Sequence, residues 1–350
     1  MLESKDVEKV DAHRMRDIIA SFPDQLEESR RRASSVHADL GKAERIFIVG
    51  MGGSGIAGEV FAAWAADRSR LPIQPIHDYR LPTYARPGDA LVVVSYSGNT
   101  EETLAAAAQG IKLGCRLVAV TSGGALAALA RNAGAAVFEV PSGLPPRGAF
   151  GHLFGILAEV GAEWVTGDMD DELDQATTHL RAIRARLAPA VPVTRNRAKR
   201  LAVRMKGSTP IVYGAPPFNA IAKRWQTQLN ENAKVVAFAS SLPEADHNEI
   251  VGWTSDPAAA RFTALILRDR AETPEMRRRL DVTAAMFRRR ARVEQVHDNE
   301  GQLLGRMLGT LYLGDYVSLY LAVLRRVDPI PLPSIVELKD RLARAPTPRS

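Results

Sequence analysis

Cysteine is almost absent from this chain of 350 residues, in which Cys115 stands alone. A single thiol excludes an intrachain disulfide and a metal site built on paired cysteines. Proteins that depend on disulfides belong to oxidising compartments, and a chain without them suits a reducing one. The sequence therefore predicts a cytoplasmic location.

Long uninterrupted apolar runs are also missing. Residues 1–32 are dense in charge and lack the apolar stretch of a signal peptide. The longest apolar segment, 301–327, is interrupted by charged residues, and so falls short of the roughly 18 apolar residues that a membrane span needs. These charged residues are Arg306, Asp315, Arg325 and Arg326. We expect no membrane partner, and we interpret the segment as a buried core or dimer-interface helix.

Signatures of metal and nucleic-acid binding are lacking as well. The seven histidines include no His-x-x-x-His pair, so we expect no metal and no cofactor. The net charge of +6 suits either a nucleic acid or a small anion drawn into a basic cleft. The arginine runs at 277–279 and 288–290 have no interleaved aromatic residues, which favours a solvated helix face over a nucleic-acid partner.

The chain does contain a regular alternation of apolar and helical segments. Short runs rich in Val and Ile recur between Ala-rich stretches, first at 45–50, 73–78, 90–96, 116–122 and 135–141. A second set follows at 210–215, 234–240, 262–269 and 292–298. Such runs are typical of parallel strands covered by helices on both faces. We expect an α/β fold with two doubly wound, flavodoxin-like parallel-sheet domains.

Changes in composition suggest the domain boundaries. Residues 1–40 form an N-terminal helical arm, and residues 41–165 form the first domain. Residues 166–200, acidic at first and then rich in arginine and proline, form a linker of bridging helices. Residues 201–350 form the second domain with its C-terminal helices.

Two loops of the first domain carry the signals for a ligand. Glycines at 50–58 follow the first strand and open a helix, where backbone N–H groups can approach an anion. The spacing is also close to a dinucleotide motif, but no acidic residue suited to a ribose follows at about 20 residues. Residues 95–103 end the third strand with hydroxyl groups and start another helix, which suits a phosphomonoester. A plain capping turn with Asn99 or Thr100 as N-cap is the alternative. A third loop, 121–124, is weaker and would only shape the crevice.

Together these segments resemble a known family. Segments 52–55 (GGSG) and 95–103 (SYSGNTEET) are similar to the sugar isomerase (SIS) domain. Segments 145–147 (PPR), 230–234 (NENAK) and 247–253 (HNEIVGW) more narrowly resemble the bifunctional phosphoglucose/phosphomannose isomerases. The resemblance extends from about residue 46 to residue 339. It implies two SIS-type domains, hexose 6-phosphates as substrates and a homodimer.

The resemblance also implies roles for particular residues. Glu231 would be the base that moves a proton between C2 and C1, although from sequence alone it could equally be a solvated glutamate at a helix end. His247, reaching the site across a dimer interface, and Lys339 would open the sugar ring, while Arg147 would stabilise the charge of the enediolate. The substrate phosphate would contact five residues of the two loops: Gly53, Ser54, Ser95, Ser97 and Thr100.

The sequence thus predicts a metal-independent aldose–ketose isomerase that interconverts glucose 6-phosphate or mannose 6-phosphate with fructose 6-phosphate through a cis-enediol. The alternative is a regulatory protein that binds a sugar phosphate without reacting, as some SIS domains do. A sensor needs the two phosphate loops but none of the acid–base residues.

Overall fold

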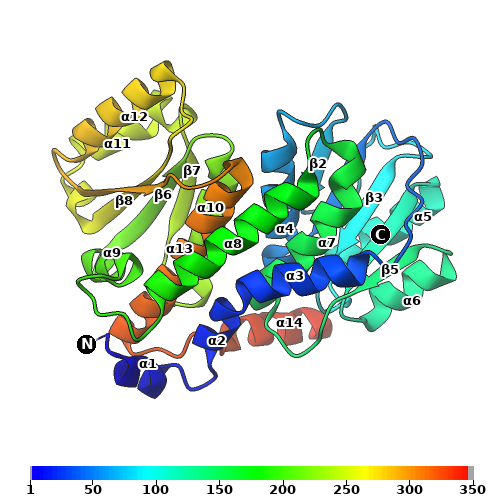
Figure 1. Ribbon diagram of the computed structural model, residues 1–350, viewed down its shortest axis with the longest axis horizontal. Coiled ribbons are helices and arrows are strands. Elements are labelled where there is room, and N and C mark those ends of the chain that lie inside the picture. The colour runs from blue at the N-terminus through cyan, green and yellow to red at the C-terminus, as the bar shows by residue number, and fades with distance from the viewer. Residues whose placement is uncertain (1, 346–350) are drawn as a thin grey trace.

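The first set of apolar runs forms a five-stranded parallel sheet in the order β2-β1-β3-β4-β5 (Figure 1). Helix α4 (Gly52–Ala65) and helix α7 (Phe150–Gly161) pack on one face of it, and α5 (Glu101–Leu113) and α6 (Gly124–Asn132) on the other. Because both faces are covered, every residue of β1 and β3 is buried. The strands are β1 (Ile46–Gly50), β2 (Ile73–Ile76), β3 (Ala90–Val94), β4 (Arg116–Thr121) and β5 (Ala136–Glu139).

The second set forms a four-stranded parallel sheet in the order β7-β6-β8-β9. Helices α9 (Arg197–Met205), α10 (Phe218–Glu231) and α13 (Leu303–Arg325) cover one face, and α11 (Glu249–Ser255) and α12 (Pro274–Phe287) the other. The strands are β6 (Thr209–Gly214), β7 (Phe238–Ser241), β8 (Phe262–Asp269) and β9 (Arg292–Asp298). Two doubly wound parallel sheets confirm the predicted fold class.

Helices outside the sheets join the two halves (Figure 1). The chain begins with α1 (Ser4–Val10), α2 (Met15–Ala20) and α3 (Phe22–Ala33), and α8 (Met169–Leu187) later packs against both α3 and α13. One hydrophobic cluster contains residues of both sheets and of these helices, so the halves share a core. The last helix is α14 (Pro333–Arg344), none of whose residues is buried. The structure describes residues 2–345.

Helix α13 is the segment that the sequence analysis judged too charged for a membrane span. Within residues 2–345 it is the one helix long and apolar enough to cross a membrane by length and composition, yet 94% of its apolar window is buried inside the protein. Its two buried charged residues form ion pairs there: Arg306 with Asp269 and Asp315 with Arg224. The interpretation as a core helix is confirmed.

Some predicted elements have different limits. The run at 234–240 becomes a strand only at Phe238, and its first residue, Lys234, has a left-handed backbone with φ of 53°. Thr100 is the N-cap of α5, but its side chain makes no capping bond. Asn99 instead accepts a hydrogen bond from the Ala125 amide, 3.0 Å away, near the start of α6. The second loop is therefore fixed to the third.

Candidate active site

The two predicted phosphate loops meet at the carboxyl edge of the first sheet. β1 and β3 are neighbours in register, with Gly50 level with Val94, so the loops that follow them leave the sheet together. The Tyr96 amide donates to Ser54 Oγ at 3.0 Å and links one loop to the other. Strands that end together at a point where the strand order reverses form the usual ligand crevice of such sheets.

The hydroxyl groups of the second loop differ in exposure. Ser95 is buried and its hydroxyl donates to Thr100 Oγ1 at 3.2 Å, whereas Ser97 is exposed. Gly98 has φ of 67°, and a Cβ there would lie 1.9 Å from the carbonyl oxygen of Gly123. The third loop is therefore packed directly against the second, at Gly98.

Arg147 lies directly behind the first loop, in the short 3-10 helix Pro146–Ala149 that begins with proline. A Cβ added to Gly53 would come within 2.7 Å of the backbone nitrogen of Arg147. The glycine thus allows the anion loop and the arginine backbone to approach each other closely. Gly53 and Arg147 are far apart in the sequence, so this contact could not be predicted from it.

Arg147 reaches from the first half of the chain to the second and contacts the predicted base. Its Nη1 lies 3.3 Å from Glu231 Oε2, at the end of α10. Its Nε donates to Asn232 Oδ1 at 2.7 Å. Its Nη2 donates to the carbonyl oxygen of Pro329 at 2.9 Å. Arg147 is 2% exposed, and burial lowers the pKa of this guanidinium, which Glu231 partly opposes.

Lys234 is a further cation beside Glu231. Its ammonium group donates to the backbone carbonyl of Glu231 and to that of Pro329, the latter at 2.8 Å. Burial and the charge of Arg147 lower the pKa of Lys234 to about 8, against the effect of Glu231. The predicted base therefore lies beside two positive charges.

Two predicted site residues lie elsewhere in the chain. Glu231 precedes the edge strand β7, whereas His247 follows it, so the two lie toward opposite ends of this strand. Lys339 is exposed on α14. Within residues 2–345, neither His247 nor Lys339 makes a side-chain hydrogen bond or ion pair. One copy of the chain thus brings together Glu231, Arg147 and the phosphate loops, but not the pair assigned to ring opening.

Sequence reasoning missed several residues that shape this site. Asn232 and Lys234 fall within the 230–234 motif, and this position beside Glu231 could have identified them as site residues. Tyr96 is less obvious: its hydroxyl donates to the Pro141 carbonyl at 2.8 Å and accepts from the Leu144 amide at 2.8 Å. It thereby fixes the segment that leads to Arg147.

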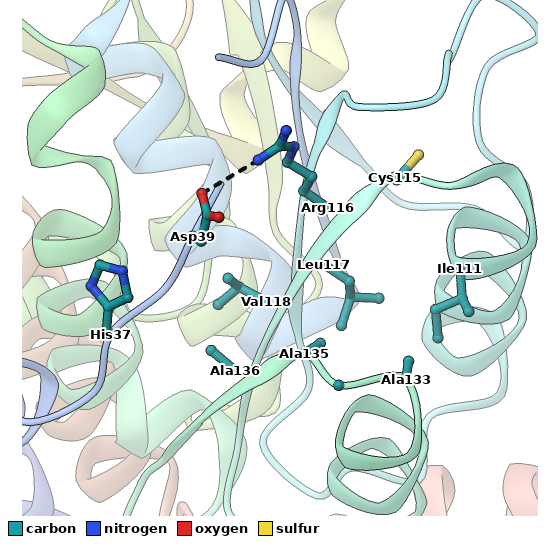
Figure 2. A pocket seen from close by; sticks show the side chains of 11 residues that line it. His37, Asp39, Ile111, Cys115, Arg116, Leu117, Val118, Ala133, Ala135 and Ala136 are labelled. Atoms are coloured by element: carbon teal, nitrogen blue, oxygen red, sulfur yellow. Dashed lines mark hydrogen bonds and ion pairs between the residues drawn. The ribbon is translucent and has the colours of Figure 1, made fainter. Parts of the chain in front are cut away.

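A pocket lies away from this cluster, at the amino ends of β4 and β5 (Figure 2). It has a volume of about 470 Å³, and an ion pair between Asp39 and Arg116, at 3.3 Å, lies on its wall. Cys115 also lines it, but burial raises the pKa of this thiol and disfavours the reactive thiolate. Size alone does not make it a catalytic site.

Among residues 2–345, no group of three or more His, Cys, Asp or Glu side chains is placed to hold a metal ion.

Comparison with known proteins shows which families the two halves of the chain resemble. A model of the SIS domain matches residues 39–142, and a model of the bacterial phospho-glucose isomerase C-terminal SIS domain matches residues 194–342. The solved C-terminal domain of glucosamine-fructose-6-phosphate aminotransferase from Francisella tularensis superposes with a TM-score of 0.71 at 16% identity. That superposition covers 90% of this chain and 97% of the other, and it supports the fold alone. Fold and loops together define a protein with two SIS domains.

Curated relatives narrow this class. The bifunctional phosphoglucose/phosphomannose isomerase of Caldicellulosiruptor bescii is 34% identical over 332 residues, which cover 93% of this chain and 98% of the relative. The D-glucosamine-6-phosphate 4-epimerase of Sulfolobus acidocaldarius is 29% identical, over 85% of this chain and 89% of the relative. This chain belongs to the bifunctional phosphoglucose/phosphomannose isomerase family, and it is an isomerase.

Proposed function

We propose that this enzyme interconverts glucose 6-phosphate and mannose 6-phosphate with fructose 6-phosphate through a cis-enediol, without a metal ion or cofactor. The observation that carries the proposal is the contact of 3.3 Å between Arg147 and Glu231 beside the phosphate loops. An aldose–ketose isomerase needs a base and a fixed cation at one end of the substrate and an anion site at the other.

In the proposed reaction, the phosphate binds the loop amides and hydroxyls at Gly53, Ser54, Ser95, Ser97 and Thr100. The carboxylate of Glu231 removes the proton from C2 of the open-chain aldose, and the electron pair moves to form the enediol as O1 takes up a proton. The same carboxylate then returns a proton to C1 while the hydroxyl at C2 loses its own, which gives the ketose. Arg147 stabilises the negative charge that develops on the oxygens.

We further propose that ring opening needs a second copy of the chain. His247 is exposed beyond the opposite end of β7 from Glu231, which supports delivery by a partner in a homodimer, and Lys339 on the exposed α14 would act with it. Mixing inactive Glu231→Gln protein with inactive His247→Ala protein tests this arrangement. Subunit exchange should restore activity, because one site in each mixed dimer then has both residues intact. A mixture that stays inactive after demonstrated exchange would contradict a shared site.

The central test is Glu231→Gln, which keeps the shape of the side chain and removes its basicity. Loss of a positioned base typically costs about 10²–10⁴-fold in rate. Both sugars share one enediol, so both activities should fall together, and solvent deuterium should enter C2 only with the wild type. Glu163→Gln, at an exposed position in the first half of the chain, is the matched control.

Circular dichroism should confirm intact folding of the Glu231→Gln variant. A near-normal rate with either sugar would mean that another residue, Glu249 or His247, is the base. A wild type that binds both aldose phosphates but converts neither would favour the regulatory alternative.

The cytoplasmic location and the division of the chain at residues 40, 165 and 200 remain predictions.

A further inference from the structure

Helix α13 is apolar along most of its length, yet two of the polar side chains that it buries, Asp315 and Ser318, lie one turn apart. Asp315 is 6% exposed and Ser318 is fully buried. Placing polar groups in a core is costly unless they are hydrogen-bonded. Both have partners, and the bonds from both lead to Arg147, which lies far away in the sequence.

The first connection supports the backbone of Arg147. Asp315 accepts from Arg224 on the neighbouring α10, with Oδ1 at 3.2 Å from Nε and Oδ2 at 2.9 Å from Nη2. The same Nη2 donates to the carbonyl oxygen of Arg147 at 2.9 Å. Arg224 is 1% exposed, and its guanidinium also lies over the ring of Phe150, 5.1 Å from the ring centre. The guanidinium of Arg224, which is bound by the Asp315 carboxylate and by the carbonyl oxygen of Arg147, has little freedom to move.

The second connection supports the side chain of Arg147. Ser318 donates its hydroxyl proton to the backbone carbonyl of Asp315 at 2.6 Å. Its oxygen is then free to accept from Asn232 Nδ2 at 2.9 Å. This bond fixes which way the amide of Asn232 faces, so Oδ1 points at Arg147 Nε, 2.7 Å away. The two connections are separate but begin on one turn of one helix.

We infer that Asp315 and Ser318 are positioning residues, which hold Arg147 in place through Arg224 and Asn232. The inference rests on the role proposed for Arg147. With Nε bound by Asn232 and Nη2 by Pro329, Nη1 is the group that faces Glu231. A small displacement of a preorganised cation costs transition-state stabilisation more than ground-state binding, because the charge that it meets develops only during the reaction.

The experiment is Ser318→Ala, with Thr310→Val as the matched control. Thr310 is also a fully buried hydroxyl residue of α13, and its Oγ1 has no hydrogen-bond partner in the described part of the chain. Ser318→Ala should lower kcat about 10-fold with both sugars while KM changes less than about 2-fold. Thr310→Val should leave both constants near the wild-type values. Asp315→Asn, which weakens the other connection, is a second test provided that the variant folds.

A double-mutant cycle separates positioning from a general structural effect. Arg147→Ala should itself lose about 10²–10³-fold in kcat. If Ser318 acts through Arg147, adding Ser318→Ala to Arg147→Ala should cost nothing further. Additive losses, or a Ser318→Ala enzyme that matches Thr310→Val, would overturn the inference and leave the proposed function standing. A fully active Arg147→Ala enzyme would instead refute the role proposed for Arg147.

Discussion

Gly53 and Arg147 are in such close contact that a single methyl group on the glycine would overlap the backbone of the arginine. The added Cβ would lie 2.7 Å from the nitrogen and 2.9 Å from Cα of Arg147. The predicted phosphate loop and the proposed catalytic cation are therefore held together, although their positions differ by 94 in the sequence, the difference between 147 and 53.

Gly53→Ala should accordingly weaken binding and catalysis together. The backbone of residues 146–147 must move to admit the methyl group, which displaces Arg147 from Glu231 and distorts the anion site. We expect KM to rise and kcat to fall, each by about 10-fold or more. Gly305→Ala is the control, because its nearest neighbour, Cα of Ala176, would be at an ordinary 3.8 Å. Steady-state kinetics that match for the two variants would contradict the contact.

The hydroxyl groups of the second loop should act mainly on binding. Ser97→Ala or Thr100→Ala removes a donor proposed to bind the phosphate, and a hydrogen bond to a charged group contributes about 1.5–3 kcal/mol. We expect KM to rise about 10-fold, with partial loss of kcat. Ser255→Ala, an exposed position at the end of α11, should change neither constant. Unchanged Michaelis constants in both loop variants would refute the phosphate site.

Chelation tests the proposal that no metal takes part. We expect purified enzyme to keep full activity on both aldose phosphates after exhaustive dialysis against EDTA. The measurement is a coupled assay before and after dialysis, with metal content followed by elemental analysis. Activity that is lost on dialysis and returns only with added zinc would overturn this part of the proposal.

His77 should make stability depend on pH. Its Nδ1 lies 2.6 Å from the Gly50 carbonyl oxygen and its Nε2 lies 2.8 Å from Glu59 Oε1, so both ring nitrogens face acceptors. The bond to Glu59 raises the pKa of His77, partly offset by burial and by the charge of Lys223. The folded state therefore holds this proton more tightly than the unfolded state, in which the pKa is about 6.5.

The sign of the effect follows from this difference. The stabilisation is fully present below about pH 6.5 and is lost as the pH rises through the higher pKa of the folded state. The difference in unfolding free energy between wild type and His77→Gln should thus be larger at pH 5.5 than at pH 9, as measured by urea denaturation. The exposed His37 supplies the control variant His37→Gln. A difference that is the same at both pH values would show that His77 is not charged in the folded protein.

The sequence by itself determined the fold class, and it predicted the two phosphate loops. Apolar runs such as 90–96 have the length and composition of buried parallel strands, and the glycine and hydroxyl loops follow them directly. These are local signals, since a strand, its loop and the next helix are adjacent in the chain. The charged positions within 301–327 did not by themselves exclude a membrane span, since α13 is long and apolar enough for one by length and composition, and it is its burial that identifies it as a core helix.

Only the tertiary structure decided which residues meet. That Arg147 contacts Glu231, and that Arg224 and Asn232 connect it to one turn of α13, depends on the packing of segments from both halves of the chain. The same packing places His247 beyond the opposite end of β7 from Glu231, because the strand between them carries the chain from one end of the sheet to the other. Sequence spacing cannot give such distances, since it records neighbours along the chain, whereas the hydrophobic core sets neighbours in space.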